Sequence, residues 1–389
     1  GDVARLARAL ADDPAFANRP GPFAMPPLAA VTSSGLIRDA EFEERLLASA
    51  RLLIAHGADV NARWIDPRFP DDPLSVLYAA AGRTHHAGMV RLLLEAGADP
   101  NDNESLYHSV ESPDLSCTRL LLAAGARVQD TNAVARALDY DRPEALALLL
   151  AHRGAAAEPN WLHHALLRGR SLAHIQALVA AGAELTVRDR TGTSVLRYAE
   201  RLGREDVVAL LRDQGISEEA SVEDSFVAAC ARSDVAAARQ LLAAQPDLFA
   251  RLSTAQLEVM PQLAAHGKSE AVGTMLALGW PREVRTAWQA TALNLAIFAG
   301  DAAMTRLLLT AGADWRTIHG HGGNALGTLS FASQADDPED GSPRDHAGCA
   351  AALIEHGVPL AAFRTYSFSD DVSDRLDRET ASAPEDALG

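Results

Sequence analysis

The sequence predicts an all-α solenoid of about ten stacked helix–turn–helix units. An apolar segment that runs into glycine recurs along the chain, most clearly in five copies. These copies are ARLLIAHGADVNA (50–62), VRLLLEAGADPND (90–102), TRLLLAAGARVQD (118–130), IQALVAAGAELTV (175–187) and TRLLLTAGADWRT (305–317). A second motif centred on leucine precedes most copies, for example SVLYAAAG (75–82), NWLHHAL (160–166) and TALNLAIFAG (291–300). In three units the leucine lies 19 residues before the glycine: 125 − 106, 215 − 196 and 312 − 293. Two motifs in one register indicate a structural repeat.

Each unit is expected to contain a short inner helix, a longer outer helix and a turn. The inner helix begins in the leucine motif, and the outer helix has leucine at i, i+3 and i+4 spacing. A glycine then ends the outer helix in a left-handed cap. The markers of these caps are Gly57, Gly97, Gly125, Gly154, Gly182, Gly215, Gln245, Gly279, Gly312 and Gly357, with seven of the nine spacings between 28 and 34 residues. One helix pair cannot bury its own apolar stripe, so neighbouring units must stack.

Several units depart from the regular length. The chain begins with a partial unit, and segments 33–46 and 332–346 lengthen two units. The composition of segment 332–346 predicts a solvated loop. The short central units predict tight turns near 101–104 and 129–132. Residues 364–389 lack the repeat and are rich in Asp and Ser, which indicates either a capping helix or a frayed tail.

The period and both motifs resemble the ankyrin repeat over residues 1–363, with residues 364–389 as an acidic cap or tail. The resemblance implies a concave groove lined by inner helices and turns, and a role in protein recognition. It also implies that His163, which occupies the family's histidine position, has a structural hydrogen-bonding role.

Composition limits the classes of partner. Lys and Arg number 35 against 52 Asp and Glu, a net charge of −17 without any basic block. This balance disfavours nucleic acid and anionic membranes and favours a neutral or basic protein or peptide. The chain lacks 18 consecutive apolar residues, a signal-peptide pattern and paired cysteine motifs. We therefore expect a cytoplasmic monomer with reduced cysteines, and the Arg- and Ala-rich composition suggests a bacterial source.

A candidate binding surface comes from aligning the leucine motifs. The residue after the family's histidine position is His108, Arg136, His164 and Tyr198 in four successive units. Equivalent helix positions repeat at roughly 10 Å, so these side chains should form a ladder. The same helix faces add Glu111, Asp139, Tyr140 and Arg168. With the shortened turns, this ladder is expected to form the open floor of the central groove.

Three interpretations of the ladder remain open. It can be a solvated stripe, a surface that recognises a protein or peptide, or a small-molecule pocket or active site with Glu111 or Asp139 as general base. No catalytic or cofactor motif is present, which favours a binding role without a cofactor. The adjacent histidine pairs His85–His86 and His163–His164 point in different directions along their helices or turns, so no metal site is expected.

Aromatic residues provide a second candidate surface. Trp64 and Phe69 lie in the polar, proline-rich segment 61–73, where exposed aromatic side chains would anchor a partner. His319, His321 and Trp315 can contact a partner near the C-terminal end or form an ordinary turn. Trp161, Trp280 and Trp288 lie near unit starts, where packing between repeats would equally well bury them.

Overall fold

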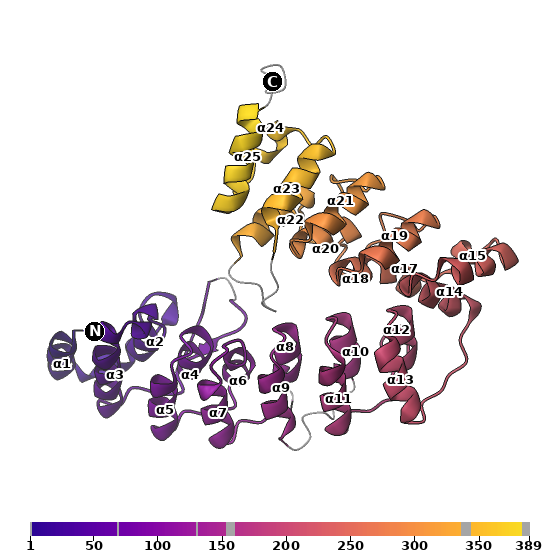
Figure 1. The fold of residues 1–389 in the computed structure, drawn as a ribbon. Helices are drawn as coiled ribbons and strands as arrows, with labels where there is room; N and C mark the ends of the chain where they lie inside the picture. The colour runs from indigo at the N-terminus through magenta and orange to yellow at the C-terminus, as the bar shows by residue number, and fades with distance from the viewer. Residues whose placement is uncertain (1, 68–69, 130, 153–159, 336–343, 383–389) are drawn as a thin grey trace. The chain divides into compact units, whose positions relative to one another are not determined.

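The computed structural model describes residues 2–67, 70–129, 131–152, 160–335 and 344–382, and these residues are mostly helical (Figure 1). The predicted all-α repeat fold is confirmed. Two short strands, β1 Arg63–Trp64 and β2 Leu74–Ser75, pair antiparallel. The chain divides into a first unit, Gly1–Trp161 with Gln176–Ala183, and a second unit, Leu162–Ile175 with Glu184–Gly389.

The first unit consists of helix pairs that follow one another along the chain. They are α1 Val3–Asp12, η1 Pro14–Asn18, η2 Pro22–Ala24, α2 Pro27–Thr32, η3 Gly35–Arg38, α3 Ala40–Ala55, α4 Val76–Tyr78, η4 Ala79–Arg83, α5 Ala87–Glu95, α6 Glu104–Ser109, α7 Ser116–Ala123, α8 Ala133–Asp139 and α9 Pro143–Leu150. The inner helix α6 packs against α8 and η4, and the outer helix α5 packs against α7. Neighbouring inner and outer helices therefore form the two layers of this stack.

The second unit continues the same pattern. Its helices are α12 Val195–Arg201, α13 Glu205–Asp213, α14 Val222–Ala231, α15 Val235–Ala244, α16 Leu248–Arg251, α17 Thr254–Leu257, α18 Val259–Ala265, α19 Ser269–Ala277, α20 Ala292–Phe298, α21 Ala302–Thr310, α22 Ala325–Gln334, α23 His346–Glu355, α24 Leu360–Phe363 and α25 Asp370–Ser382. The boundary between the units falls within α10 Trp161–Leu167 and α11 Leu172–Ala180.

The glycines end the outer helices as predicted. At Gly125, φ is +93°; the Gly125 N–H donates to the Leu122 carbonyl and the Ala126 N–H donates to the Leu121 carbonyl. This is the Schellman arrangement, and it satisfies carbonyls that the last turn leaves unpaired. All described marker glycines have positive φ, whereas Gln245 ends α15 at φ −140°. Gly154 lies outside the described residues.

The core lies between the helix layers. The residue four positions before each described marker glycine is fully buried, namely Leu53, Leu93, Leu121, Leu178, Leu211, Met275, Leu308 and Leu353. Each such side chain contributes about 1.5–3 kcal/mol by leaving water. Hydroxyl side chains begin many inner helices: Ser75, Ser194 and Thr291 each accept a backbone N–H of the first turn. The alternation of cap, helix and glycine therefore sets the repeat.

The irregular segments differ in how they fold. Segment 33–46 forms η3 and the beginning of α3, and buries Ile37 and Leu46. The short turn before α6 ends at Asn103 (φ +76°), and the turn before α8 ends at Asn132 (φ +55°). In the long insertion, residues 336–343, including the acidic group Asp336, Asp337, Glu339 and Asp340, lie outside the described residues. Within 364–389, α25 packs against α23 and fully buries Val372.

The three cysteines are buried and unpaired, and burial raises the pKa of each thiol to about 12. They therefore behave as small apolar residues, as the sequence predicts.

Candidate functional site

The inner helices α6 and α8 bring together a polar and aromatic group in the first unit. We name it the His108 cluster and define it as Tyr107, His108, Glu111, Arg136 and Tyr140. Four of these five residues belong to the ladder predicted from the sequence, and Tyr107 is the one that the prediction did not include. The cluster is the part of that prediction for which the structure gives direct side-chain contacts.

His108 lies between two carboxylates. Its Nδ1 is 2.6 Å from Glu111 Oε1 and its Nε2 is 3.2 Å from Glu104 Oε2. Burial by itself would lower the pKa of His108, but the hydrogen bonds to Glu104 and Glu111 outweigh it and raise the pKa. Burial would likewise raise the pKa of Glu111, but His108 and Arg136 lower it. The pair is therefore most stable with His108 protonated and Glu111 ionised.

Arg136 is held by Glu111 and two tyrosines. Its Nε and Nη2 donate to Glu111 Oε1 at 2.9 and 2.8 Å, and Nη2 also donates to the Tyr140 hydroxyl at 3.1 Å. The guanidinium carbon lies 5.1 Å from the Tyr107 ring centre and 4.5 Å from that of Tyr140. The side chain is 19% exposed. The result is a half-buried cation with a fixed plane.

Because residue 82 is a glycine, His108 on α6 can pack closely against η4, the helix before it. A Cβ at Gly82 would lie 2.6 Å from His108 Cβ and 2.7 Å from Tyr78 Cε2, closer than such atoms can approach. The Tyr78 and His108 rings meet edge to face at 5.0 Å. The sequence signal for this contact is the glycine at the end of SVLYAAAG (75–82).

The remaining ladder residues are spread over both units. Asp139 ends α8 half-buried, His164 lies on α10, and Arg168 follows α10, both also half-buried. Because His164, Arg168 and Tyr198 belong to the second unit, the continuous ladder from His108 to Tyr198 stays a prediction.

At Tyr198 the expectation of an open groove floor is wrong. The Tyr198 hydroxyl donates to Gln262 Oε1 of α18 at 3.0 Å, and burial raises its pKa. Nearby, the His266 Nε2 lies 2.8 Å from the Leu167 carbonyl at the end of α10. Residues of and just after α18 thus contact α12 and the end of α10 across 64 and 99 residues of sequence, and no local pattern encodes such contacts.

His163 has the structural geometry that the sequence predicts. Its Nε2–H donates to the Thr193 carbonyl at 2.9 Å, and the side chain is buried. Burial lowers its pKa, which favours the neutral ring. His163 thus links α10 to the turn before α12 inside the second unit.

The aromatic candidates divide into buried and exposed residues. Trp64 is 3% exposed, with the Arg83 guanidinium 5.4 Å from its ring, so the expectation of an exposed anchor is wrong there. Pairing of β1 with β2 turns this segment inward. Phe69 lies outside the described residues. The sequence left burial and exposure of the other tryptophans open: Trp161 and Trp280 are buried, whereas Trp288 is 64% exposed.

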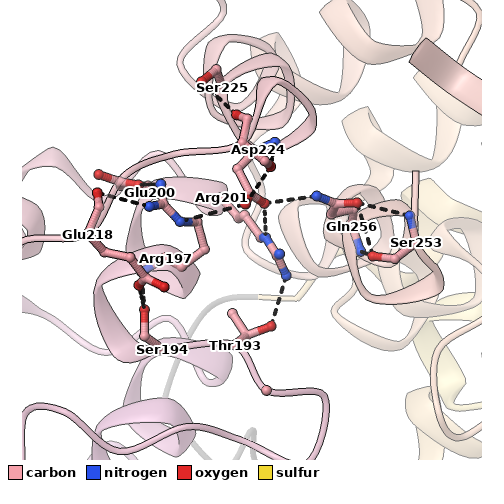
Figure 2. A network of polar contacts seen from close by, with 12 residues as sticks. Thr193, Ser194, Arg197, Glu200, Arg201, Glu218, Asp224, Ser225, Ser253 and Gln256 are labelled. Carbon is pink, nitrogen blue, oxygen red and sulfur yellow. Dashed lines mark hydrogen bonds and ion pairs between the residues drawn. The ribbon is translucent and has the colours of Figure 1, made fainter. Parts of the chain in front are cut away.

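A second polar network, which sequence reasoning missed, lies in the second unit (Figure 2). Arg201 Nε donates to Asp224 Oδ1 at 2.8 Å, and Gln256 Nε2 donates to the same oxygen at 2.9 Å. Arg197 pairs with Glu200 and donates to the Glu218 carbonyl. These side chains are nearly all buried and link α12, α14 and α17. The available signal was the charged sequence RYAER (197–201), which places three charged residues in one inner helix.

The network has a structural role. Burial would raise the pKa of Asp224, but the hydrogen bonds from Gln256 and Arg201 lower it. The carboxylate receives donors at both oxygens, because Ser221 binds Oδ2 at 2.8 Å. A fully paired buried carboxylate offers little to a ligand.

Across the residues that the structure describes, no group of three or more His, Cys, Asp or Glu side chains could hold a metal ion. None of the described helices is both long enough and apolar enough to span a bilayer.

The stacked helix pairs with glycine caps define a helical-repeat protein. The family model described as "Ankyrin repeat" matches residues 74–104, which contain β2, α4, η4 and α5. Residues 74–104 are therefore similar to one ankyrin repeat. The solved ankyrin repeat domain of human ASB11 matches with 16% identity and a TM-score of 0.26, covering 86% of this chain and 98% of that one. Comparison with curated proteins gives no match.

Proposed function

We propose that this protein is a scaffold that binds a partner protein or peptide through the inner helices of its first unit, with the His108 cluster as the contact. The observation that carries the proposal is Arg136, a half-buried cation between the Tyr107 and Tyr140 rings. Arginine and tyrosine in such rigid settings dominate the energetics of protein interfaces. The ankyrin-repeat fold generally serves protein recognition, which supports the same conclusion.

The electrostatics of the cluster favour binding over catalysis. A general base needs a pKa near the working pH and a free lone pair directed at substrate. Glu111 has a lowered pKa and accepts from both His108 and Arg136. His108 has both ring nitrogens at carboxylates. The alternative of an enzyme with Glu111 as base is therefore the weaker proposal.

The charge of the chain defines the rest of the proposal. With a net charge of −17, the partner is a neutral or basic protein or peptide rather than nucleic acid or an anionic membrane surface. We further propose that the protein acts as a monomer in a bacterial cytoplasm. His164, Arg168, Asp139 and Tyr198 extend the contact only if the ladder runs across both units.

The test uses a partner captured from native lysate and identified by mass spectrometry, followed by affinity measurements with purified variants. Arg136→Ala should weaken binding at least about tenfold, since truncation of a central arginine costs about 2 kcal/mol. Arg136→Lys keeps the charge but loses the planar stacking, and should give an intermediate loss. Arg119→Ala on the exposed face of α7 is the matched control and should leave affinity unchanged. Equal affinity of all three variants for the partner would refute the proposal.

A further inference from the structure

Exposed apolar side chains concentrate on two successive repeats of the second unit. Among the residues that the structure describes, nine large apolar side chains are exposed: Phe23, Leu36, Ile65, Leu167, Val235, Trp288, Phe298, Ile318 and Phe331. The last four fall within residues 288–331, whereas the others are scattered over residues 23–235. Single exposed apolar residues are ordinary, but a group on adjacent repeats marks an interaction surface.

Two of these residues form a stacked pair. Phe298 on α20 and Phe331 on α22 are 44% and 68% exposed, and their ring centres are 6.4 Å apart with an interplanar angle of 15°. Each lies five residues after the leucine of its inner-helix motif, as Glu111 does in the first unit. The inner-helix position that carries a paired carboxylate in the His108 cluster therefore carries exposed aromatic rings here.

A cation borders the pair. The Arg344 guanidinium carbon lies 5.7 Å from the Phe298 ring centre. Arg344 forms no ion pair with any carboxylate that the structure describes, and the neighbouring Asp345 side chain instead caps α23 by accepting the Gly348 N–H. The surface thus combines an aromatic platform with a guanidinium at its edge.

We propose that Phe298, Phe331 and Arg344, named here the Phe298 ledge, bind a segment of another protein that carries a large apolar or aromatic side chain next to a carboxylate. An added ring or aliphatic chain extends the stacked pair and buries its exposed faces. A carboxylate accepts hydrogen bonds from the Arg344 guanidinium. This surface lies in the second unit and goes beyond the His108 cluster.

Two arguments favour this occupant over the alternatives. A second copy of the chain would meet the ledge with the same surface, which places two Arg344 side chains together between two molecules of charge −17 each. The net charge also favours basic partners at long range, but charges farther than about 8 Å are screened at physiological salt. Arg344 lies against the Phe298 ring, so its positive charge favours an acidic group of the partner at this place.

The experiment measures fluorescence anisotropy of labelled short peptides with the purified full chain. Three peptides of equal length are used: one with phenylalanine and leucine flanked by glutamates, the same peptide with lysines in place of glutamates, and the glutamate peptide with alanine at the apolar positions. The first should bind, the second should bind about tenfold more weakly, and the third should give no measurable binding. Phe331→Ser and Arg344→Ala should each lower the affinity for the first peptide at least about tenfold.

Two control variants isolate the ledge. Phe23→Ser removes a phenylalanine of similar exposure to Phe331 (61% against 68%) from the first unit and should not change affinity. Arg136→Ala should also have no effect, which separates this proposal from the role of the His108 cluster. Circular dichroism of each variant checks that the fold is intact.

Several results would overturn the proposal. They are failure of all peptides to bind, preference for the lysine peptide, or unchanged affinity in a folded Phe331→Ser variant. Concentration-dependent self-association that Phe331→Ser abolishes would assign the ledge to a second copy of the chain instead.

Discussion

Arg136 and Arg197 both lie on inner helices, yet their surroundings give them different roles. Arg197 is 5% exposed and is surrounded by Glu200, Asp224 and the Glu218 carbonyl. Arg136 is 19% exposed, and two tyrosine rings cover its faces while its edge contacts Glu111. An arginine as buried as Arg197 holds helices together, whereas a half-buried arginine with fixed orientation can also meet a partner.

We predict that His108 makes stability depend on pH near neutrality. Its pKa is raised in the folded protein, so its contribution is fully present below the ordinary histidine pKa of about 6.5 and is lost as pH rises through the folded pKa. In the His108→Gln variant, the urea midpoint of unfolding should change less with pH between about pH 6 and 8 than it does in the natural chain. His321→Gln is the control, and an identical pH profile for the natural and His108→Gln chains would contradict the assignment.

The glycine caps give a second residue-scale prediction. Gly125→Val should lower stability by at least about 1 kcal/mol, because valine is strained at φ +93° although the space around Gly125 is open. Gly273→Ala on α19, where φ is not positive and no atom lies within 4 Å of a Cβ, should stabilise by about 0.5–1 kcal/mol. Thermal melting compares them. Equal melting temperatures of the two variants would count against the cap.

At the scale of elements, polar contacts join the inner helices of the second unit where other repeats have apolar packing. Asp224 on α14 binds Arg201 from α12 and Gln256 from α17, and Arg201 also donates to Thr193. Helix α18 contacts α12 through the pair Tyr198–Gln262. These contacts coincide with the unit whose outer helix ends at Gln245 rather than at a glycine. The network therefore joins consecutive elements where the repeat pattern is weakest.

We predict that Asp224→Ala destabilises the second unit by about 3–5 kcal/mol, since it leaves the buried Arg201 without its partner. Asp247→Ala provides the comparison. Its ion pair with Arg251 is on the surface and should contribute no more than about 1 kcal/mol. Urea unfolding followed by circular dichroism measures both. If the double variant Asp224→Ala with Arg201→Met is no more stable than Asp224→Ala, the unpaired charge is not the cause of the loss.

At the scale of the molecule, the two units share one building principle. Each consists of helix pairs in which capped inner helices alternate with glycine-terminated outer helices. Most packing contacts join neighbouring pairs, as expected for a repeat protein. Strand structure among the described residues is confined to β1, β2 and a single bridge between Arg188 and Ser194.

The whole chain should therefore give a far-ultraviolet circular dichroism spectrum dominated by helix. The reason is that almost all regular structure in the described residues is helical. A substantial sheet signal in the purified protein would be incompatible with this fold.

The candidate site was only partly predictable. The spacing of the leucine motif placed His108, Glu111, Arg136 and Tyr140 on one stripe, because residues three and four apart share a helix face. The roles of Trp64 and Tyr198 were missed, because strand pairing and a contact with α18 decide their exposure. The exposed pair Phe298–Phe331 was missed because no single helix shows which of its apolar residues the neighbouring repeat leaves uncovered.

By itself, the sequence determined the helical repeat, its register and the positions of its caps, since these follow from interactions within about four residues and from the backbone freedom of glycine. Only the tertiary structure decided which inner-helix side chains are exposed, paired or covered. Asp224 with Gln256, Tyr198 with Gln262 and Phe298 with Phe331 are each more than 30 residues apart in the chain. Their contacts depend on how successive repeats pack, and a local periodicity carries no record of that packing.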